Sequence, residues 1–407
     1  MRLLIVSQYF WPETFRINDL ARELIARGHE VTILTGLPNY PDGKIFSQYR
    51  KNPLDHGNFE GAPVLRVPVV PRGANSLQLA INYLSFAVSG CLFGRSKLRG
   101  RTFDAIFVFQ TSPITSALPA LWIGRKRRIP VLMWVLDLWP ETLSAVGVVK
   151  SPRWLRLVEC LVRFIYRRCE LILVQSRAFV ESVDRYAGGR KKIRYFPGWA
   201  ENVFEDATYA GKVPELAPYA DKFKILFAGN IGHAQDFPAI VAAADLLRDV
   251  ADLVWIVAGD GRAASEAKSE VARLGLENKV IFLGRFPLER MPSFFDEADA
   301  LLVSLRDEPV WGMTIPGKVQ SYLASSKPLL GMLNGEGARV IDDAGAGLVG
   351  PAGNAEALAA NVSKLITMAP DTRLAMGKAG RDYCAREFNR ELLVDRLEKW
   401  IVDLQNA

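Results

Sequence analysis

The segment 301–337 constrains the fold more than any other part of the sequence. A short apolar run at 300–303 is typical of a strand buried in a parallel sheet, and the charged residues 306–308 follow its carboxyl end. A helix is then predicted at about 319–325, with Lys318 where it begins. Ligands of open α/β sheets bind at the carboxyl ends of strands, and the free N–H groups of a helix start favour anions. The segment therefore predicts a βαβ unit, either with an anion site around Lys318 or with an ordinary polar loop.

The alternation of predicted strands and helices continues through most of the chain. Its 407 residues are more than one hydrophobic core normally holds, so we expect two domains. The alternation predicts the α/β class, with two doubly wound, Rossmann-like domains. The boundaries that we predict are 1–200 for a first domain, 201–222 for a linker, 223–380 for a second domain and 381–407 for a closing helix.

Polar loops follow several predicted strands of the first domain. Glu13 lies in the loop after the first strand, Asn39 lies in a turn after the second, and Asp137 and Glu141 follow the strand at 131–135. Because the carboxyl ends of parallel strands meet at one edge of a sheet, these side chains are candidates for binding a substrate. The alternative is that each belongs to a long loop without a ligand.

Glycine-rich turns end the predicted strands of the second domain. They are found at 229–232, at 259–261 and at 284. Glycine lets backbone amides approach a ligand closely, which suits a nucleotide diphosphate. Neither a GxGxxG fingerprint at the first helix of a domain nor a Walker A sequence is present, so the turns alone are a weak signal.

The composition excludes several classes of protein. A net charge of +7 is too small to indicate nucleic-acid binding, and no basic-aromatic motif of that kind appears. The four cysteines are scattered and only three histidines are present, so we expect reduced thiols, no metal site and a cytoplasmic location. No secretory signal is visible at the amino terminus.

One hydrophobic stretch and three basic clusters point to a membrane surface. Residues 77–94 are the most hydrophobic of the chain, and bases follow at 95–101; further bases lie at 125–128 and along a predicted helix at 151–169. An apolar helix beside bases suits a segment in the interface of an anionic membrane. The alternative is a core helix of the first domain.

Several motifs together resemble glycosyltransferases of family 4, which have the GT-B fold, and the resemblance covers essentially the whole chain. Among such proteins, the chain is similar to the branch of L-fucosamine (N-acetyl-L-fucosaminyl) transferases of O-antigen, colanic-acid and capsule synthesis. The matching pieces are PE near the first strand with ARELIARGHEVTILTG, DLWPET at 137–142, YFPGW at 195–199, AGNIGHAQDF at 228–237, AGDGR at 258–262, FLGRFP at 282–287, and PGKVQSYLASSKPLLG with NGEGARVI.

The resemblance implies two domains with a cleft between them and a C-terminal helix that closes back on the first domain. It implies transfer of a sugar, with retention at the anomeric carbon, from a nucleoside-diphosphate sugar, with UDP as the expected nucleotide. The expected acceptor is an isoprenyl-diphosphate-linked saccharide at the inner face of the cytoplasmic membrane. No metal or other cofactor is expected.

The sequence departs from the family pattern at the donor site. The two glutamates of most members fall on Met313 and Ser321, and the usual Arg and Lys fall on Asn230 and Gln235. The histidine often found beside Asp137 is replaced by leucine. Different residues must therefore hold the donor diphosphate.

We assign roles on this basis, since the leaving diphosphate needs cations and helix amides more than a nucleophile. Three groups of residues follow from the resemblance and from the placement argued above. They are, for catalysis, Lys318, Glu308 and Asp137; for the donor, Gly229, Asn230, Gly232, Arg285, Arg306, Gly317, Ser321 and Glu336; and for the acceptor, Glu13, Asn39 and Glu141.

Two alternatives stay open at the level of sequence. A nucleotide-sugar epimerase can share the fold, but it needs carboxylates for proton chemistry and no basic surface for a membrane. A non-catalytic scaffold subunit of a polysaccharide assembly complex would explain the missing glutamate pair.

Overall fold

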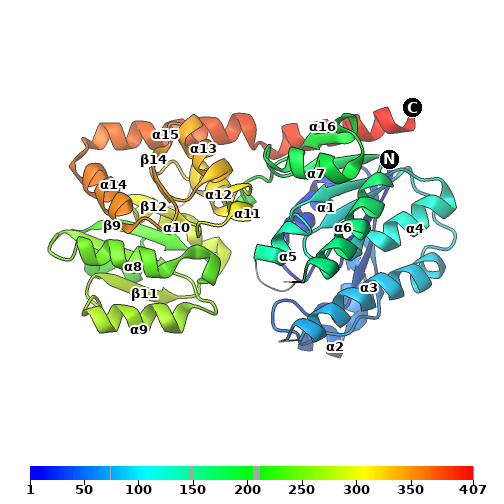
Figure 1. Ribbon diagram of the computed structural model, residues 1–407, viewed down its shortest axis with the longest axis horizontal. Coiled ribbons are helices and arrows are strands. Elements are labelled where there is room, and N and C mark those ends of the chain that lie inside the picture. The colour runs from blue at the N-terminus through cyan, green and yellow to red at the C-terminus, as the bar shows by residue number, and fades with distance from the viewer. Residues whose placement is uncertain (74, 146–150, 205–210, 407) are drawn as a thin grey trace. The chain divides into compact units, whose positions relative to one another are not determined.

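The computed structural model describes residues 1–73, 75–145, 151–204 and 211–406, and it divides into two compact units (Figure 1). The first consists of Met1–Pro197 and Glu391–Ala407, and the second of Gly198–Arg390. The segment 201–222, which we expected to be a linker, contributes Phe204, Val213 and Leu216 to the buried core of the second unit. The apolar side chains of this segment explain the difference, because removing them from water into the core stabilises the folded protein.

The sheet of the first unit has eight strands in the described residues, in the order β3-β4-β2-β1-β5-β6-β7-β8. All neighbours pair in parallel except β3 and β4. The strand order reverses between β1 and β5, which is where open sheets of this kind form a crevice. The strands are β1 (Arg2–Val6), β2 (Glu30–Gly36), β3 (Asn58–Phe59), β4 (Ala62–Val67), β5 (Ala105–Gln110), β6 (Val131–Val135), β7 (Leu171–Val174) and β8 (Ile193–Tyr195).

The helices of the first unit pack on this sheet, and α3 and α4 lie side by side (Figure 1). Because α3, α4 and α6 connect strands that follow one another in the same direction along the sheet, right-handed crossovers place them on one face. The helices are α1 (Arg16–Ala26), α2 (Ser47–Lys51), α3 (Ser76–Lys97), α4 (Leu118–Arg127), α5 (Glu141–Ala145), α6 (Pro152–Arg167), α7 (Phe179–Ala187) and α16 (Arg390–Gln405).

The last helix of the chain, α16, belongs to the first unit. Arg27 pairs with Asp395 and, at 3.1 Å, with Glu398, and the His29 Nε2 atom lies 2.6 Å from Glu398. The ring of Trp400 contacts Phe196 at 6.2 Å between centroids. The prediction that a C-terminal helix closes back on the first domain is confirmed. The helix begins at Arg390 instead of at the predicted residue 381, because residues 381–387 belong to the preceding helix of the second unit.

The sheet of the second unit has six described strands, all parallel, in the order β11-β10-β9-β12-β13-β14. The strands are β9 (Phe223–Ala228), β10 (Leu253–Ala258), β11 (Val280–Gly284), β12 (Ala300–Ser304), β13 (Leu329–Met332) and β14 (Gly347–Gly350). The helices are α8 (Phe237–Leu246), α9 (Ala264–Leu274), α10 (Met291–Glu297), α11 (Pro309–Gly312), α12 (Gly317–Ala324), α13 (Gly335–Asp343), α14 (Ala355–Thr367) and α15 (Pro370–Glu387).

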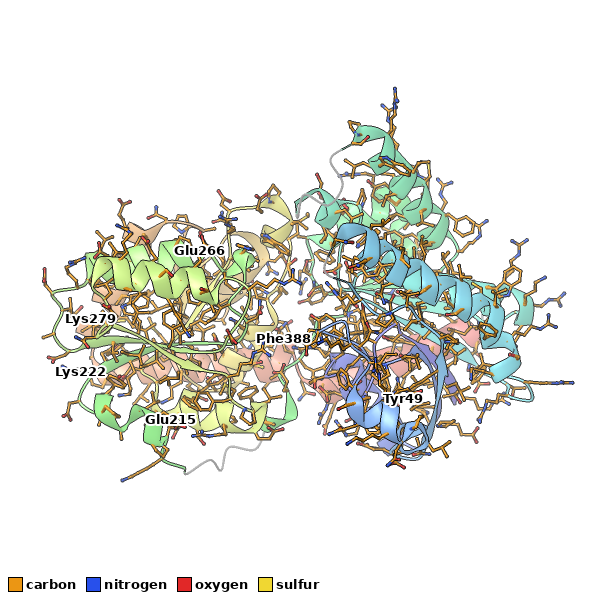
Figure 2. The ribbon with its side chains drawn as sticks, turned by 90° about the horizontal axis from the view of Figure 1, so that it is seen from below. Tyr49, Glu215, Lys222, Glu266, Lys279 and Phe388 are labelled. Carbon is orange, nitrogen blue, oxygen red and sulfur yellow. The ribbon has the colours of Figure 1, made fainter. Side chains whose placement is uncertain are left out.

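Both faces of the second sheet are buried, as the continuous apolar strands predict. Leu226 and Leu301 belong to one core cluster, whereas their neighbours Ile225 and Leu302 belong to the other. Phe388, just after α15, is buried in the first of these clusters and is labelled in Figure 2, which shows the side chains between the sheet and its helices. The predicted class, α/β with two doubly wound Rossmann-like domains, is confirmed.

The strand order of the second sheet reverses between β9 and β12, and the two strands pair over a short distance only. Ile225 pairs with Ala300, and Leu226 with Leu301. Further along, the Tyr322 hydroxyl of α12 accepts a hydrogen bond from the Ala228 N–H (3.0 Å) and donates one to its C=O (3.2 Å). A side chain thus takes the place of a strand partner where β9 ends.

The substitution Tyr322→Phe tests this arrangement. It leaves the buried backbone groups of Ala228 without their partner, so we expect the free energy of unfolding to fall by about 1–3 kcal/mol. The measurement is urea unfolding followed by tryptophan fluorescence. The control is Tyr219→Phe, since Tyr219 is half-buried and packs on the same core. A loss no larger than that of the control would contradict the assigned role of the hydroxyl.

Candidate functional site

The strand reversal in the second unit brings three segments together. These are the turn after β9, the loop after β12 and the first turn of α12. The Arg306 N–H donates to the C=O of Ala234 (2.9 Å), and the Ser304 hydroxyl donates to the C=O of Gln235 (2.6 Å). The loop after β12 is thus fastened to the turn after β9, at the edge where ligands of doubly wound sheets bind.

Lys318 is the central side chain of this edge. Its ammonium nitrogen is buried and has no hydrogen-bond partner among the described residues. It lies 3.3 Å from the ring centroid of Phe227 on β9, so a cation–π contact partly compensates the charge. A buried charge without a counter-charge is costly, and it marks a place where an anion would be bound strongly.

The turn after β9 makes room for Lys318 because it is built on glycine. Gly229 has a φ of +121°, and a Cβ there would lie 2.9 Å from Lys318 Cε. A Cβ at Gly259, after β10, would lie 1.8 Å from the C=O oxygen of Gly229. Only glycine at both positions lets the two turns and the lysine pack this closely.

Most backbone N–H groups of this turn donate hydrogen bonds to other groups of the protein. The N–H groups of Gly229 and Ile231 donate to the C=O groups of Ala258 and Asp260, and the Gly232 N–H donates to Gln235 Oε1 (3.0 Å). Of the turn 229–232, this leaves the Asn230 N–H as the candidate for a ligand. Three of the four backbone N–H groups of the turn are thus engaged within the protein. Contact of this turn, of Lys318 or of Gly317 with a donor diphosphate stays a prediction.

Burial lowers the pKa of Lys318 well below its ordinary value of 10.5. An anion placed beside the ammonium would act in the opposite direction, because an opposite charge favours the charged form. Binding of an anion at this position would therefore favour protonation of Lys318.

The other predicted donor residues divide into exposed and engaged side chains. Glu308 and Arg306 are exposed in the loop after β12, and Arg285 lies at the end of β11 with Asp260 at 3.9 Å. Ser321 is engaged, because its hydroxyl donates to Glu201 (2.5 Å).

Glu336 and Gly317 complete the predicted donor set. The buried carboxylate of Glu336 accepts two hydrogen bonds of 3.0 Å from Arg339, which lies three residues further along α13. Gly317 is the exposed first residue of α12. The side chains of Glu336 and Ser321 thus make hydrogen bonds within the protein beside the site. Their contact with a donor stays a prediction.

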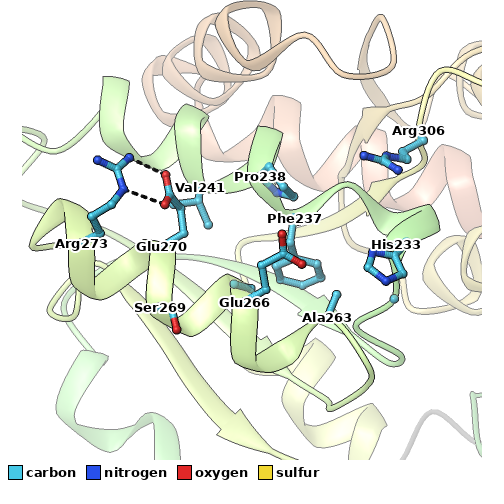
Figure 3. Close-up of a pocket in the computed structure, with 12 residues that line it drawn as sticks. His233, Phe237, Pro238, Val241, Ala263, Glu266, Ser269, Glu270, Arg273 and Arg306 are labelled. Atoms are coloured by element: carbon cyan, nitrogen blue, oxygen red, sulfur yellow. Dashed lines mark hydrogen bonds and ion pairs between the residues drawn. The ribbon is translucent and has the colours of Figure 1, made fainter.

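A pocket of about 430 Å³ lies next to this edge, between α8 and α9 (Figure 3). His233 and Arg306 stand at one end, and the paired side chains of Glu270 and Arg273 stand at the other. Its volume is in the range of small-molecule sites. The sequence reasoning missed His233, although it lies in the same glycine-rich turn motif as Asn230 and Gly232.

In the first unit, Glu13 and Asn39 are buried and hold loops at the carboxyl edge. Glu13 accepts hydrogen bonds from the backbone N–H groups of Phe10 (3.1 Å), Asn39 (2.8 Å) and Tyr40 (2.7 Å). The Asn39 side chain accepts from the Arg72 N–H (2.9 Å) and donates to the C=O of Leu37 (2.8 Å). Both residues therefore shape the edge, and direct contact with an acceptor stays a prediction.

Asp137 and Glu141 follow β6 at the same edge. Burial raises the pKa of Asp137, while hydrogen bonds from the side chain and backbone of Ser112 act in the opposite direction. The Ser182 hydroxyl donates to Glu141 Oε1, and the buried Oε2 atom has no partner within the described residues. Ser112 was not predicted; its position at the end of the neighbouring strand β5 was the available signal.

The described residues contain no group of three or more His, Cys, Asp or Glu side chains placed to hold a metal ion.

Comparison with known families gives two matches that together span most of the chain. Residues 14–199 match the family described as "Glycosyl transferase 4-like domain", and residues 212–383 match "Glycosyl transferases group 1". The first match falls in the unit that carries Glu13 and Asp137, and the second in the unit that carries Lys318.

Two curated relatives are similar over different lengths. "Putative colanic acid biosynthesis glycosyl transferase WcaI" of Escherichia coli K12 is 24% identical over 340 residues, which are 80% of this chain and 81% of the relative. "Probable glycosyltransferase WbjE" of Pseudomonas aeruginosa is 28% identical over 247 residues, 57% of this chain and 59% of the relative.

Among solved structures, HepE of Anabaena in complex with UDP has a TM-score of 0.70 at 15% identity. The match covers 99% of this chain and 100% of HepE. At this identity the similarity concerns the fold, and it extends over both units.

The stability of the ligand-free protein should report the burial of Lys318. A lysine whose pKa is lowered on folding binds fewer protons in the folded than in the unfolded state between its folded pKa and 10.5, so the free energy of unfolding rises with pH in that window. We expect this rise to disappear in Lys318→Met, measured by urea unfolding at pH 7.5 and 9.5. Lys327→Met is the control, because Lys327 bonds to Asp296 at the surface. Identical slopes in wild type and Lys318→Met would contradict the burial.

Glu13 should give the opposite slope at lower pH. Burial raises its pKa from 4.5 to about 7, against the three backbone hydrogen bonds. The folded state then binds more protons than the unfolded state between these values, so stability falls as the pH rises through them. We expect the difference in unfolding free energy between wild type and Glu13→Gln to fall, by at most about 3 kcal/mol, from pH 4.5 to pH 7.5. A difference that stays constant between these pH values would disprove the assigned pKa shift of Glu13.

Proposed function

Because the chain is a glycosyltransferase with the GT-B fold, built from a glycosyl transferase 4-like domain and a glycosyl transferases group 1 domain, we propose that it makes a bacterial surface polysaccharide. In this proposal it moves a sugar, with retention, from a nucleoside-diphosphate sugar to a lipid-linked or oligosaccharide acceptor. The observation that carries the proposal is the buried ammonium of Lys318 at the strand reversal of the second unit, which has no hydrogen-bond partner in the described part of the chain.

The proposed chemistry places the leaving group beside Lys318. Negative charge grows on the diphosphate as the anomeric bond breaks, and a cation fixed in a buried site stabilises that charge more than one in water. The Lys318 ammonium, the start of α12 and Arg306 are the groups that meet this need. Because the cations are supplied by the protein, the proposal includes no metal and no organic cofactor.

Carboxylates at the two edges have separate proposed roles. The exposed Glu308 lies one loop from Lys318 and would bind hydroxyl groups of the donor sugar. Asp137 lies in the first unit and would orient the attacking hydroxyl of the acceptor. Neither needs to act as a nucleophile, since the donor phosphate can take the proton of the acceptor hydroxyl.

The proposed donor is UDP-linked, and N-acetyl-L-fucosamine is the sugar that the sequence motifs favour. Support for the nucleotide comes from HepE, which was solved with UDP and, separately, with UDP-glucose. The name of WcaI, a relative in colanic acid biosynthesis, supports surface polysaccharide as the product.

We place the enzyme on the inner face of the cytoplasmic membrane, as a peripheral protein. Within the described residues, one helix, Leu77–Lys97, is long and apolar enough to cross a membrane by composition, and 33% of its most hydrophobic window is buried in the first unit. The proposed acceptor is an isoprenyl-diphosphate-linked saccharide, which such a location would bring within reach.

The decisive experiment is a panel of nucleotide sugars with a lipid-linked acceptor extract, read by release of nucleoside diphosphate and by NMR of the product. We compare wild type, Lys318→Met and Lys327→Met. One donor should react, and Lys318→Met should reduce turnover about 10²–10³-fold, as expected for loss of a group that stabilises the leaving charge. Lys327→Met should be close to wild type.

Other results would change the proposal in defined ways. Turnover that survives Lys318→Met would remove the phosphate role of Lys318 but keep the transferase. Donor binding without turnover would favour a scaffold subunit. Conversion of the donor to an epimer without an acceptor would favour an epimerase. The anomeric configuration of the product, compared with that of the donor, decides between retention and inversion.

A further inference from the structure

We propose that a basic pocket between the carboxyl ends of α3 and α4 binds the headgroup phosphate of an anionic phospholipid. The pocket has a volume of about 880 Å³. It is lined by the last turns of the two helices and by the segment that leads into β5. The proposal rests on the membrane location proposed above and adds a defined lipid site to it.

The bases of the pocket converge from two helices. Arg95, Arg99 and Arg101 are exposed at and after the end of α3, and Lys126 is exposed at the end of α4. Arg127 donates to the C=O groups of Arg101 (2.9 Å) and Leu98 (3.1 Å), and so ties the two helix ends together. One base per helix end would suffice to balance a helix dipole. A larger cluster around one hollow indicates a bound anion.

The described residues that line the pocket include no Asp or Glu, and acidic residues are rare in this part of the sequence. Between Glu60 and Asp137 the sequence contains ten Lys and Arg residues but one acid, Asp104. Asp104 is paired with Arg2, at 2.6 Å. The pocket therefore has a positive field, which attracts an anionic surface over several ångströms.

An exposed apolar stripe leads directly to the pocket. It lies along α3, with exposed fractions between 42% and 71%, and consists of Leu77, Ile81, Leu84, Val88 and Leu92. The spacing of three and four residues puts these side chains on one face, about 22 Å long. Leu92 ends the stripe and also lines the pocket, where the exposed Trp122 of α4 joins it.

The opposite face of α3 fixes the helix on the unit. Phe86 is fully buried, and the buried Asn82 accepts a hydrogen bond from Gln8 (2.8 Å) and donates one to the C=O of Val70 (2.6 Å). A helix held in this way lies along a membrane surface instead of crossing it. Its apolar stripe would enter the interface while the bases meet the headgroups.

The basic pocket and the adjoining apolar stripe together favour a lipid bilayer as the partner. A nucleic acid would match the bases but would leave the apolar stripe in water. A purely apolar partner would leave the arginines without counter-charges. Only a surface with acyl chains next to phosphate groups matches both parts, so the occupant is the phosphate of an anionic lipid within a bilayer.

The pocket lies at the edge of the sheet opposite to the predicted acceptor residues. Phe103 and Ile129, which line it, precede β5 and β6, whereas Asp137 follows β6. Five strand residues separate the two edges, which corresponds to about 16 Å. A lipid bound in the pocket therefore leaves the carboxyl edge open for the acceptor.

The test is sedimentation of the full chain with vesicles of phosphatidylcholine, alone or with one quarter phosphatidylglycerol. We expect wild type to bind the anionic vesicles strongly and the neutral vesicles only weakly. Arg95→Gln/Arg99→Gln should weaken anionic binding about 30-fold, if each base near the surface contributes as bases usually do. The control is Arg50→Gln/Lys51→Gln, two exposed bases of α2 in the same unit with the same change in charge. Helix α2 lies in the connection from β2 to β4, which runs the other way along the sheet and therefore crosses the face opposite to α3. We expect less than a threefold effect.

Three results would overturn the proposal. The first is equal binding of both vesicle types by wild type, and the second is an equal loss of binding in the pocket variant and the α2 control. The third is protection against heat by inorganic phosphate without any vesicle binding, which would assign the pocket to a soluble phosphate. Donor turnover with a detergent-dispersed acceptor is measured in parallel and should be unchanged in the pocket variant. Absence of turnover in wild type would count against the proposed function, independently of the vesicle result.

Discussion

The second unit depends on one constraint, which is that β9 and β12 pair over only two residues before they part. Helix α12 fills the place of the missing ladder: Tyr322 satisfies the end of β9, and Lys318 reaches the glycine turn that follows it. The same helix thus supplies a neutral group that completes the backbone hydrogen bonds and a cation that has no hydrogen-bond partner among the described residues. The two side chains are four positions apart, which is little more than one turn, so they lie on the same face of the helix.

Much of this arrangement could be predicted from the sequence, because it follows from local patterns. Apolar runs followed by glycine or charged residues identified the parallel strands, and Lys318 was placed at a helix start at a strand's carboxyl edge. What sequence could not provide were contacts between distant segments. The hydrogen bond of Ser321 with Glu201 joins residues 120 positions apart, and it commits a hydroxyl that sequence reasoning assigned to the donor. The segment expected as a linker likewise contains Val213 and Leu216. These residues are buried because they pack on core residues of the second unit that are distant in the sequence.

The first unit shows how carboxylates of similar sequence context differ in role. Glu13 and Asp137 both follow strands, yet Glu13 is enclosed by backbone N–H groups from two loops, whereas Asp137 is held by Ser112. In each case burial raises the pKa of the carboxyl group, but for Glu13 the hydrogen bonds close a loop over it. Sequence pattern predicts that each carboxylate lies at the edge of the sheet. It does not predict which backbone N–H groups bond to the carboxylate, because those of Asn39 and Tyr40 come from a loop distant from Glu13 in the sequence.

The chain passes from the first unit to the second after Pro197 and returns after Arg390. In topological terms, the second unit is an insertion into the first, since α16 completes what the first 197 residues begin. A gene fragment that ends before α16 would therefore damage the amino-terminal unit, because Arg27 and His29 would lose Glu398, while the second unit would stay contiguous. The second unit is thus one uninterrupted piece of polypeptide, whereas the first is assembled from two pieces that are distant in the sequence.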